Sequence, residues 1–112
     1  MSGTDKMKFS TRAIHAGQDP EPTSGAVNVP VFFTSTYVHE ELDQYKAKGY
    51  WYGRSNNPTR TALETCLASL ENGKYGLCFA SGMAATSATM NLLQSGDHVV
   101  CEEDVYGGTY RL

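Results

Sequence analysis

Residues 77–86, LCFASGMAAT, change from large apolar side chains to glycine and alanine where a predicted strand gives way to a predicted helix. A strand that turns sharply into a helix often needs a glycine, so the pattern has a purely structural explanation. A bound anion is a second explanation, because the first amides of a helix are free donors and carry about half a positive charge. Gly82 would let a phosphate approach these amides closely. By itself this stretch leaves both explanations open.

A helix is predicted before this stretch. Apolar residues recur there at steps of three and four, which places them on one face of a helix: Leu63, Cys66, Leu67 and Leu70. Thr59 is the expected N-cap of this helix and Asn72-Gly73 its expected stop.

The segments from residue 75 onward continue the alternation of elements. Residues 75–80 (YGLCFA) predict a buried strand, and residues 82–94 predict a helix with Ser81 as its cap and Gly96 just past its end. Residues 98–103 (HVVCEE) predict a second strand. Helices and strands in alternation favour an α/β layer architecture, although two strands alone do not make a stable sheet.

The first 58 residues differ from the rest. They hold all four prolines and show no sustained helical period apart from a short charged stretch at residues 40–48, EELDQYKAK. We therefore expect an N-terminal arm over residues 1–58 and the start of a larger domain over residues 59–112. Arg111 and Leu112 look like the beginning of a further element, so we expect the chain to be incomplete.

Composition excludes several functional classes. The formal net charge of −3 gives no reason to expect a nucleic-acid or membrane-surface partner. No apolar stretch approaches the length of a membrane span, and the N-terminus lacks the apolar centre of a signal peptide. Three widely spaced cysteines (Cys66, Cys78 and Cys101) favour reduced core residues of a cytoplasmic protein. No ligand spacing supports a metal site at the histidines.

Two further stretches carry candidate binding residues. In GYWYGRSNNPTR (49–60), Tyr52 and Arg54 are two residues apart, so an extended backbone would point both to one face and toward one phosphate. A solvated arginine beside a packed tyrosine is the alternative. In DVYGGTYRL (104–112), two glycines follow Tyr106, whose ring could stack on a flat aromatic ligand or simply occupy a turn.

Four segments in this order resemble one family, the cystathionine γ-lyase and γ-synthase group of pyridoxal-phosphate (PLP) enzymes. They are AIHAGQDP (13–20), YGRSNNPTR (52–60), FASGMAAT (79–86) and GDHVVCEEDVYGGTYR (96–111). The resemblance implies the N-terminal part of a fold-type-I PLP-dependent transferase, with residues 59–112 beginning its PLP-binding large domain. It implies a cytoplasmic homotetramer, a dimer of dimers whose active sites are shared between subunits.

The resemblance also implies roles for single residues. Gly82 and Met83 would offer backbone N–H groups to the cofactor phosphate, and Tyr52 and Arg54 would bind the same phosphate from the neighbouring subunit. Tyr106 would stack on the pyridine ring, and Arg111 would lie near the substrate entrance.

The expected activity is α,γ-elimination of cystathionine to cysteine, 2-oxobutanoate and ammonia. The alternatives are cystathionine γ-synthase, methionine γ-lyase or a non-catalytic truncated product.

The chain departs from this family in its length, because family members are several times longer. The Schiff-base lysine of the family is expected beyond residue 112. None of the five lysines present matches it: Lys6, Lys8, Lys46, Lys48 and Lys74. We therefore expect no catalytic residue within this chain, and no activity of the chain alone.

Overall fold

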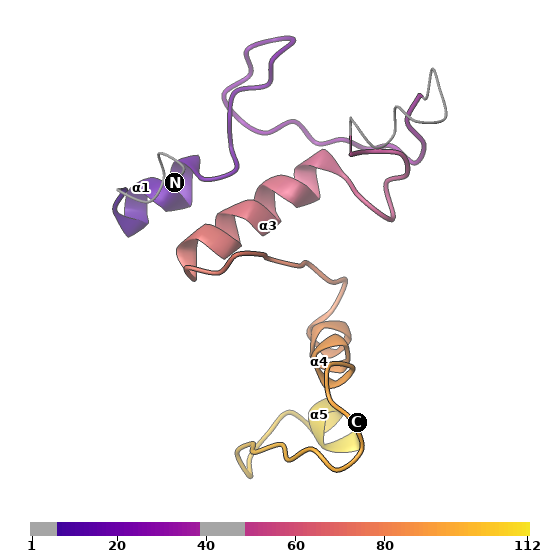
Figure 1. Ribbon diagram of the computed structural model, residues 1–112. Coiled ribbons are helices and arrows are strands. Elements are labelled where there is room, and N and C mark those ends of the chain that lie inside the picture. The colour runs from indigo at the N-terminus through magenta and orange to yellow at the C-terminus, as the bar shows by residue number, and fades with distance from the viewer. Residues whose placement is uncertain (1–6, 39–48) are drawn as a thin grey trace. The chain divides into compact units, whose positions relative to one another are not determined.

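The computed structural model describes residues 7–38 and 49–112, and the contacts within the chain divide it into two compact units, Met1–Leu77 and Cys78–Leu112. The first unit contains helices α1 (Phe9–His15) and α3 (Pro58–Leu70). The second contains α4 (Gly82–Met90) and α5 (Gly107–Arg111) (Figure 1). None of the helices in the described ranges is long and apolar enough to cross a membrane. The predicted stretch at residues 40–48 lies outside the described residues.

Helix α1 packs against α3 through the small core of the first unit. Ala16 is 2% exposed and Cys66 8% exposed, and these are the buried apolar side chains in the described parts of the chain. Gly17 follows with φ +72°, and a Cβ atom there would lie 2.7 Å from Cβ of Thr65 and 2.8 Å from the carbonyl oxygen of Ala62. Both the backbone conformation and the close approach to α3 therefore require glycine at position 17.

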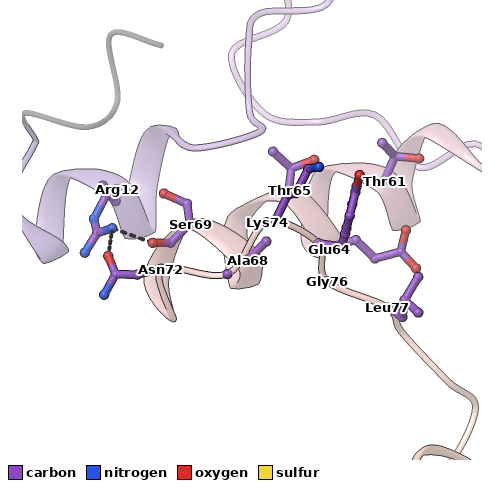
Figure 2. A pocket seen from close by; sticks show the side chains of 12 residues that line it. Arg12, Thr61, Glu64, Thr65, Ala68, Ser69, Asn72, Lys74, Gly76 and Leu77 are labelled. Atoms are coloured by element: carbon purple, nitrogen blue, oxygen red, sulfur yellow. Dashed lines mark hydrogen bonds between the residues drawn. The ribbon is translucent and has the colours of Figure 1, made fainter. Parts of the chain in front are cut away.

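The C-terminus of α3 is closed by its own backbone and by an arginine from α1. Asn72 has φ +54°, and the N–H of Gly73 donates to the carbonyl of Ala68 at 2.8 Å, as in a Schellman motif. Nη1 of Arg12 donates to the carbonyl oxygen of Ser69 and, at 2.9 Å, to Oδ1 of Asn72 (Figure 2). The predicted stop at Asn72-Gly73 is confirmed, and a cation at this end also complements the helix dipole.

The N-terminus of α3 differs from the prediction. Asn57 is the N-cap, with its side chain accepting from the N–H of Thr59 at 2.9 Å, and Pro58 is the first helical residue. Proline suits the first helical position because the N–H that it lacks would have no helical partner there. Since the helix begins at Pro58, the N-cap is the preceding residue. The hydroxyl of Thr59 instead donates to the carbonyl of Pro30 and accepts from the N–H of Phe32, both at 2.9 Å. Thr59 thus ties the arm to α3 and does not cap it.

The arm is not wholly extended, because residues Phe9–His15 form α1. This helix has no side-chain cap and no acidic residue in its first turn. A helix of this length is marginal in water without tertiary contacts, so its packing on α3 stabilises it. That packing is not visible in a seven-residue sequence pattern.

Helix α4 begins as predicted and ends early. Ser81 is the N-cap, and its hydroxyl accepts from the N–H of Ala84 at 3.1 Å. The helix ends at Met90 and not at residue 94, because the following N–H groups turn to carbonyls three residues back and a separate turn closes between Gln94 and Asp97. Gly96, with φ +101°, belongs to that turn.

The two predicted strands are wrong for this chain. Residues 75–80 and 98–103 form no ladder in the described ranges, where the one bridge joins Thr36 and Tyr52. Leu77 is 75% exposed and Val100 96% exposed, so neither segment is buried. An extended segment becomes a strand only when its N–H and C=O groups pair with a neighbour, and neither segment has such a neighbour here.

The three cysteines differ in burial, as do the segments that carry them. None of the three, all of which lie in the described ranges, forms a disulfide; Cys66 is buried, Cys78 is intermediate and Cys101 is exposed. The expectation that all three are core residues is therefore wrong for Cys101, which lies in a segment without a packing partner.

We expect the 112-residue chain by itself to be poorly folded or to aggregate. Its described residues bury two apolar side chains, whereas Leu77, Phe79 and Val100 stay exposed, and unpaired apolar segments associate with other chains. Hydrogen exchange with mass spectrometry should show fast exchange over residues 75–80 and 98–103. Slow, cooperative protection of both segments in a soluble monomer would contradict this prediction.

The turn at residues 21–24 should respond to acid. The carboxylate of Glu21 accepts from the Ser24 hydroxyl and N–H, both at 2.7 Å, and from the Thr23 N–H at 3.0 Å. These bonds, with the Ser24 hydroxyl first, lower the pKa of Glu21 from 4.5 to about 2. Because the folded-state pKa is depressed, the carboxylate stabilises the turn above pH 4.5, and this contribution is lost as the pH falls through about 2. A carboxyl-carbon NMR titration should give that pKa, and Ser24→Ala should raise it.

Candidate functional site

In the first unit, the predicted pair Tyr52 and Arg54 comes together on one face. The guanidinium carbon of Arg54 lies 4.8 Å from the centroid of the Tyr52 ring. Tyr52 forms an antiparallel bridge with Thr36, and the N–H of Gly53 donates to the carbonyl of Ser35 at 2.6 Å. The Arg54 side chain is exposed and has no ion pair within residues 7–38 and 49–112. An exposed cation stacked on a ring in this way is available to an anion.

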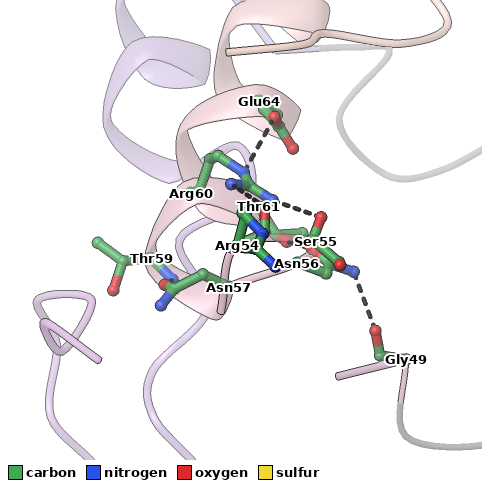
Figure 3. Close-up of polar contacts among 9 residues, drawn as sticks. All are labelled: Gly49, Arg54, Ser55, Asn56, Asn57, Thr59, Arg60, Thr61 and Glu64. Atoms are coloured by element: carbon green, nitrogen blue, oxygen red, sulfur yellow. Dashed lines mark hydrogen bonds and ion pairs between the residues drawn. The ribbon is translucent and has the colours of Figure 1, made fainter. Parts of the chain in front are cut away.

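The turn that carries Arg54 is held from several sides (Figure 3). The N–H groups of Ser55 and Asn56 donate to the carbonyl of Tyr52 at 3.0 and 2.9 Å. Arg60, on the first turn of α3, donates from Nη1 to the carbonyl of Arg54 at 3.2 Å and from Nη2 to that of Ser55 at 2.6 Å. Arg60 is not among the predicted site residues. Its signal is a positive charge at a helix N-terminus, where the helix dipole disfavours it.

In the second unit, the start of α4 presents free hydrogen-bond donors. The Ser81 hydroxyl satisfies the N–H of Ala84, whereas the N–H groups of Gly82 and Met83 have no acceptor in the described part of the chain. A Cβ atom added to Gly82 would meet nothing within 4 Å, so the space beside this backbone is open. The site therefore has two donors, a positive helix end and an unobstructed approach, which together suit an anion.

Met83 and Tyr106 meet at a second glycine. A Cβ atom on Gly108 would lie 2.6 Å from Cε1 of Tyr106 and 2.7 Å from Sδ of Met83. The Tyr106 ring therefore lies beside the backbone of Gly108, which carries no side chain. Tyr106 is 73% exposed and precedes α5, so much of its ring surface remains available for stacking.

Arg111 is the last residue of α5, and its exposed side chain belongs to the last turn of that helix. The structure shows no contact that assigns it a role, and its place near a substrate entrance stays a prediction. Among the described residues, no group of three or more histidine, cysteine or acidic side chains is arranged to hold a metal ion.

A groove of about 660 Å³ lies in the first unit, between α3 and the segment after it (Figure 2). Its lining includes Arg12, Glu64, Thr65 and Lys74, and none of the predicted site residues lines it.

The chain matches one protein family over nearly its whole length. The family described as "Cys/Met metabolism PLP-dependent enzyme" matches residues 10–112. A probable cystathionine gamma-synthase of Herpetosiphon aurantiacus is 59% identical over 104 residues, covering 93% of this chain and 32% of that protein. A cystathionine beta-lyase of Coxiella burnetii is 54% identical over 107 residues (96% and 27%). A cystathionine gamma-lyase of Bacillus subtilis is 51% identical over 106 residues (95% and 27%).

Solved structures of proteins with related names are also similar to this chain. MetB from Corynebacterium glutamicum is similar with a TM-score of 0.87 and 43% identity, covering 98% of this chain and 29% of that one. Cystathionine gamma-lyase from Lactobacillus plantarum, complexed with L-serine, is similar with a TM-score of 0.81 and 44% identity (94% and 27%). The chain thus spans between a quarter and a third of the length of the relatives that it matches.

Proposed function

Because the chain belongs to the family of Cys/Met metabolism PLP-dependent enzymes, we propose that it forms the N-terminal part of a cystathionine γ-lyase. The likeness to the solved structures confirms the predicted fold class, that of a fold-type-I PLP-dependent enzyme. In the whole protein, residues 1–58 would be the arm and residues 59–112 the start of the large domain. We further propose a cytoplasmic enzyme.

The family's cofactor is PLP, and the residues at the start of α4 suit its phosphate. The observation that carries the proposal is the pair of N–H groups at Gly82 and Met83, which have no acceptor among the described residues and face an open approach. A phosphate dianion there would accept both hydrogen bonds and interact favourably with the positive helix end. Ser81, as N-cap, keeps the first turn in the conformation that presents these donors.

Tyr52 and Arg54 would bind the same phosphate from a neighbouring subunit. Their stacked arrangement supports this proposal, because it brings a hydroxyl donor and a guanidinium to one face. Such a site is complete only when two copies assemble. The proposal therefore includes a homo-oligomer, a dimer of dimers, in which each active site is shared.

Tyr106 would stack on the pyridine ring, and its exposed ring beside Gly108 supports that role. Arg111 would lie near the substrate entrance. The cofactor, when bound, supplies the electron-withdrawing ring that lets a proton leave the α-carbon of an amino acid. This chain would bind and orient that ring, and the proton-transferring lysine would come from outside residues 1–112.

The proposed reaction converts cystathionine and water to cysteine, 2-oxobutanoate and ammonia. The cystathionine gamma-lyases of B. subtilis and L. plantarum favour it. The named relatives also include gamma-synthases, beta-lyases and a methionine gamma lyase. β-Elimination would break the other carbon–sulfur bond of cystathionine and, with uptake of water, give homocysteine, pyruvate and ammonia.

The first test is the coding sequence beyond codon 112. An open reading frame that supplies a lysine for the cofactor supports an enzyme, and an immediate stop codon supports the non-catalytic alternative.

In the second test, the full-length protein is incubated with cystathionine and the oxo acid that it produces is identified. We expect 2-oxobutanoate; pyruvate would identify a β-lyase, and methanethiol release from methionine would identify a methionine γ-lyase. Formation of cystathionine with cysteine as the incoming thiol, without its cleavage, would identify a γ-synthase. We expect no oxo acid from residues 1–112 alone.

A further inference from the structure

We infer that Arg60 is the positioning residue that fixes the turn carrying Arg54. Its guanidinium bridges two consecutive carbonyl groups of that turn, those of Arg54 at 3.2 Å and Ser55 at 2.6 Å (Figure 3). The inference rests on the proposed function, because it matters for the cofactor only if Arg54 binds the phosphate.

The location of Arg60 is unfavourable for a helix. It lies in the first turn of α3, which has no acidic residue, and the helix dipole disfavours a cation there. Glu64, one turn further along, compensates in part, with its Oε1 3.5 Å from Nε of Arg60. The side chains of Arg60 and Glu64 are 30% and 19% exposed, so the pair is partly shielded from solvent. This ion pair directs the guanidinium toward the turn that precedes the helix.

The planar fork of arginine matches this task. Two carbonyl oxygens of neighbouring residues need two donors at a fixed separation, which a guanidinium provides and an ammonium does not. The same turn is also tied to α3 by the hydroxyl of Thr61, which donates to Oδ1 of Asn56 at 3.0 Å. The side chain of Asn56 therefore forms two hydrogen bonds. Its Oδ1 accepts from Thr61 in α3, and its Nδ2 donates to the carbonyl of Gly49 at 3.0 Å.

With the turn held in this way, the Arg54 side chain remains unoccupied by these bonds and lies over Tyr52. Arg60 thus acts on the backbone of Arg54 and leaves the Arg54 guanidinium for the anion. Preorganising a binding cation reduces the conformational entropy lost when the ligand binds.

The test is a double-mutant cycle in the full-length protein, with PLP affinity of the apoprotein as the main readout. We expect Arg60→Ala to weaken PLP binding about tenfold when Arg54 is present and less than about twofold in the Arg54→Ala background. Arg60→Lys, which keeps the charge but not the fork, should lose most of the same affinity. Lys74→Ala removes one positive charge beyond the other end of α3 and should leave PLP affinity unchanged.

Hydrogen exchange of the peptide that contains Ser55 and Asn56 is the second readout. Exchange should accelerate in Arg60→Ala and Arg60→Lys while circular dichroism stays that of the parent. Equal fold-losses in both Arg54 backgrounds, or unchanged exchange, would overturn the role of Arg60. If Arg54→Ala by itself leaves PLP affinity unchanged, the proposed role of Arg54 in phosphate binding is wrong. Faster exchange in Arg60→Ala would then still show that Arg60 fixes the turn, so the two failures can be distinguished.

Discussion

Replacing Arg54 with alanine in the full-length enzyme should weaken PLP binding about 100-fold, because the change removes charge-assisted hydrogen bonds of about 1.5–3 kcal/mol to a dianion. Arg54 is exposed and has no ion pair in the described ranges, so the fold should be unaffected. Dialysis of the purified protein, followed by the absorbance of retained cofactor, measures the loss. Normal retention would identify Arg54 as a surface charge beside a packing tyrosine.

Tyr52→Phe is the matched control for this prediction. It keeps the ring that lies 4.8 Å from the Arg54 guanidinium and removes only the hydroxyl. The expected loss is about fivefold, since the change removes one uncharged donor, which contributes about 1 kcal/mol. A loss as large as that of Arg54→Ala would assign the dominant contact to the hydroxyl.

Mixing subunits tests whether Arg54 serves the neighbouring site. Arg54→Ala subunits are combined with subunits that lack the cofactor-bonding lysine. In a mixed dimer one site then has both groups intact and the other has both defects, so random exchange should restore roughly a quarter of the parent activity. Mixed dimers without regained turnover, where exchange is demonstrated, would place Arg54 outside the partner's site.

The second large effect is expected at Gly82. Gly82→Asp places a carboxylate at the first position of α4, where it suits the helix dipole but repels a phosphate. Two charges about 4 Å apart near a protein surface interact by about 4 kcal/mol, so after partial screening we expect PLP affinity to fall about 100-fold below that of Gly82→Asn. Thermal stability should instead be equal or higher in Gly82→Asp. Titration calorimetry of the apoproteins and thermal unfolding measure the two effects.

Gly82→Asn is the matched control because asparagine has nearly the same shape as aspartate without its charge. A Cβ atom at this position meets nothing within 4 Å, so both variants should keep the parent fold. Equal PLP affinity of the two variants would mean that no anion lies at the start of α4.

Local signals were sufficient for the start of α4, for the stop of α3 and for the proximity of neighbouring side chains, but not for the start of α3 or the end of α4. The cap at Ser81 and the stop at Asn72-Gly73 are set by groups within a few residues of each helix end, and both were predicted. Tyr52 and Arg54 come together as predicted, but through a turn that begins at Tyr52 and not through the extended backbone on which the prediction rested. The family could be identified from the sequence because its four segments keep their residues and their order.

Contacts between distant residues decided the rest. Helix α1 exists because Arg12 and Ala16 lie against a helix some 50–60 residues later, and Thr59 binds the arm instead of capping α3 for the same kind of reason. The segments 75–80 and 98–103 have the composition of strands but no neighbour with which to pair in residues 7–38 and 49–112. The hydrogen bonds from Arg60 to the carbonyls of Arg54 and Ser55 span only six and five residues, but they too were not predicted, because they depend on the path of the turn before the helix. A sequence pattern determines which groups can form hydrogen bonds and which side chains are apolar, whereas the partner of each group depends on the path of the chain in space.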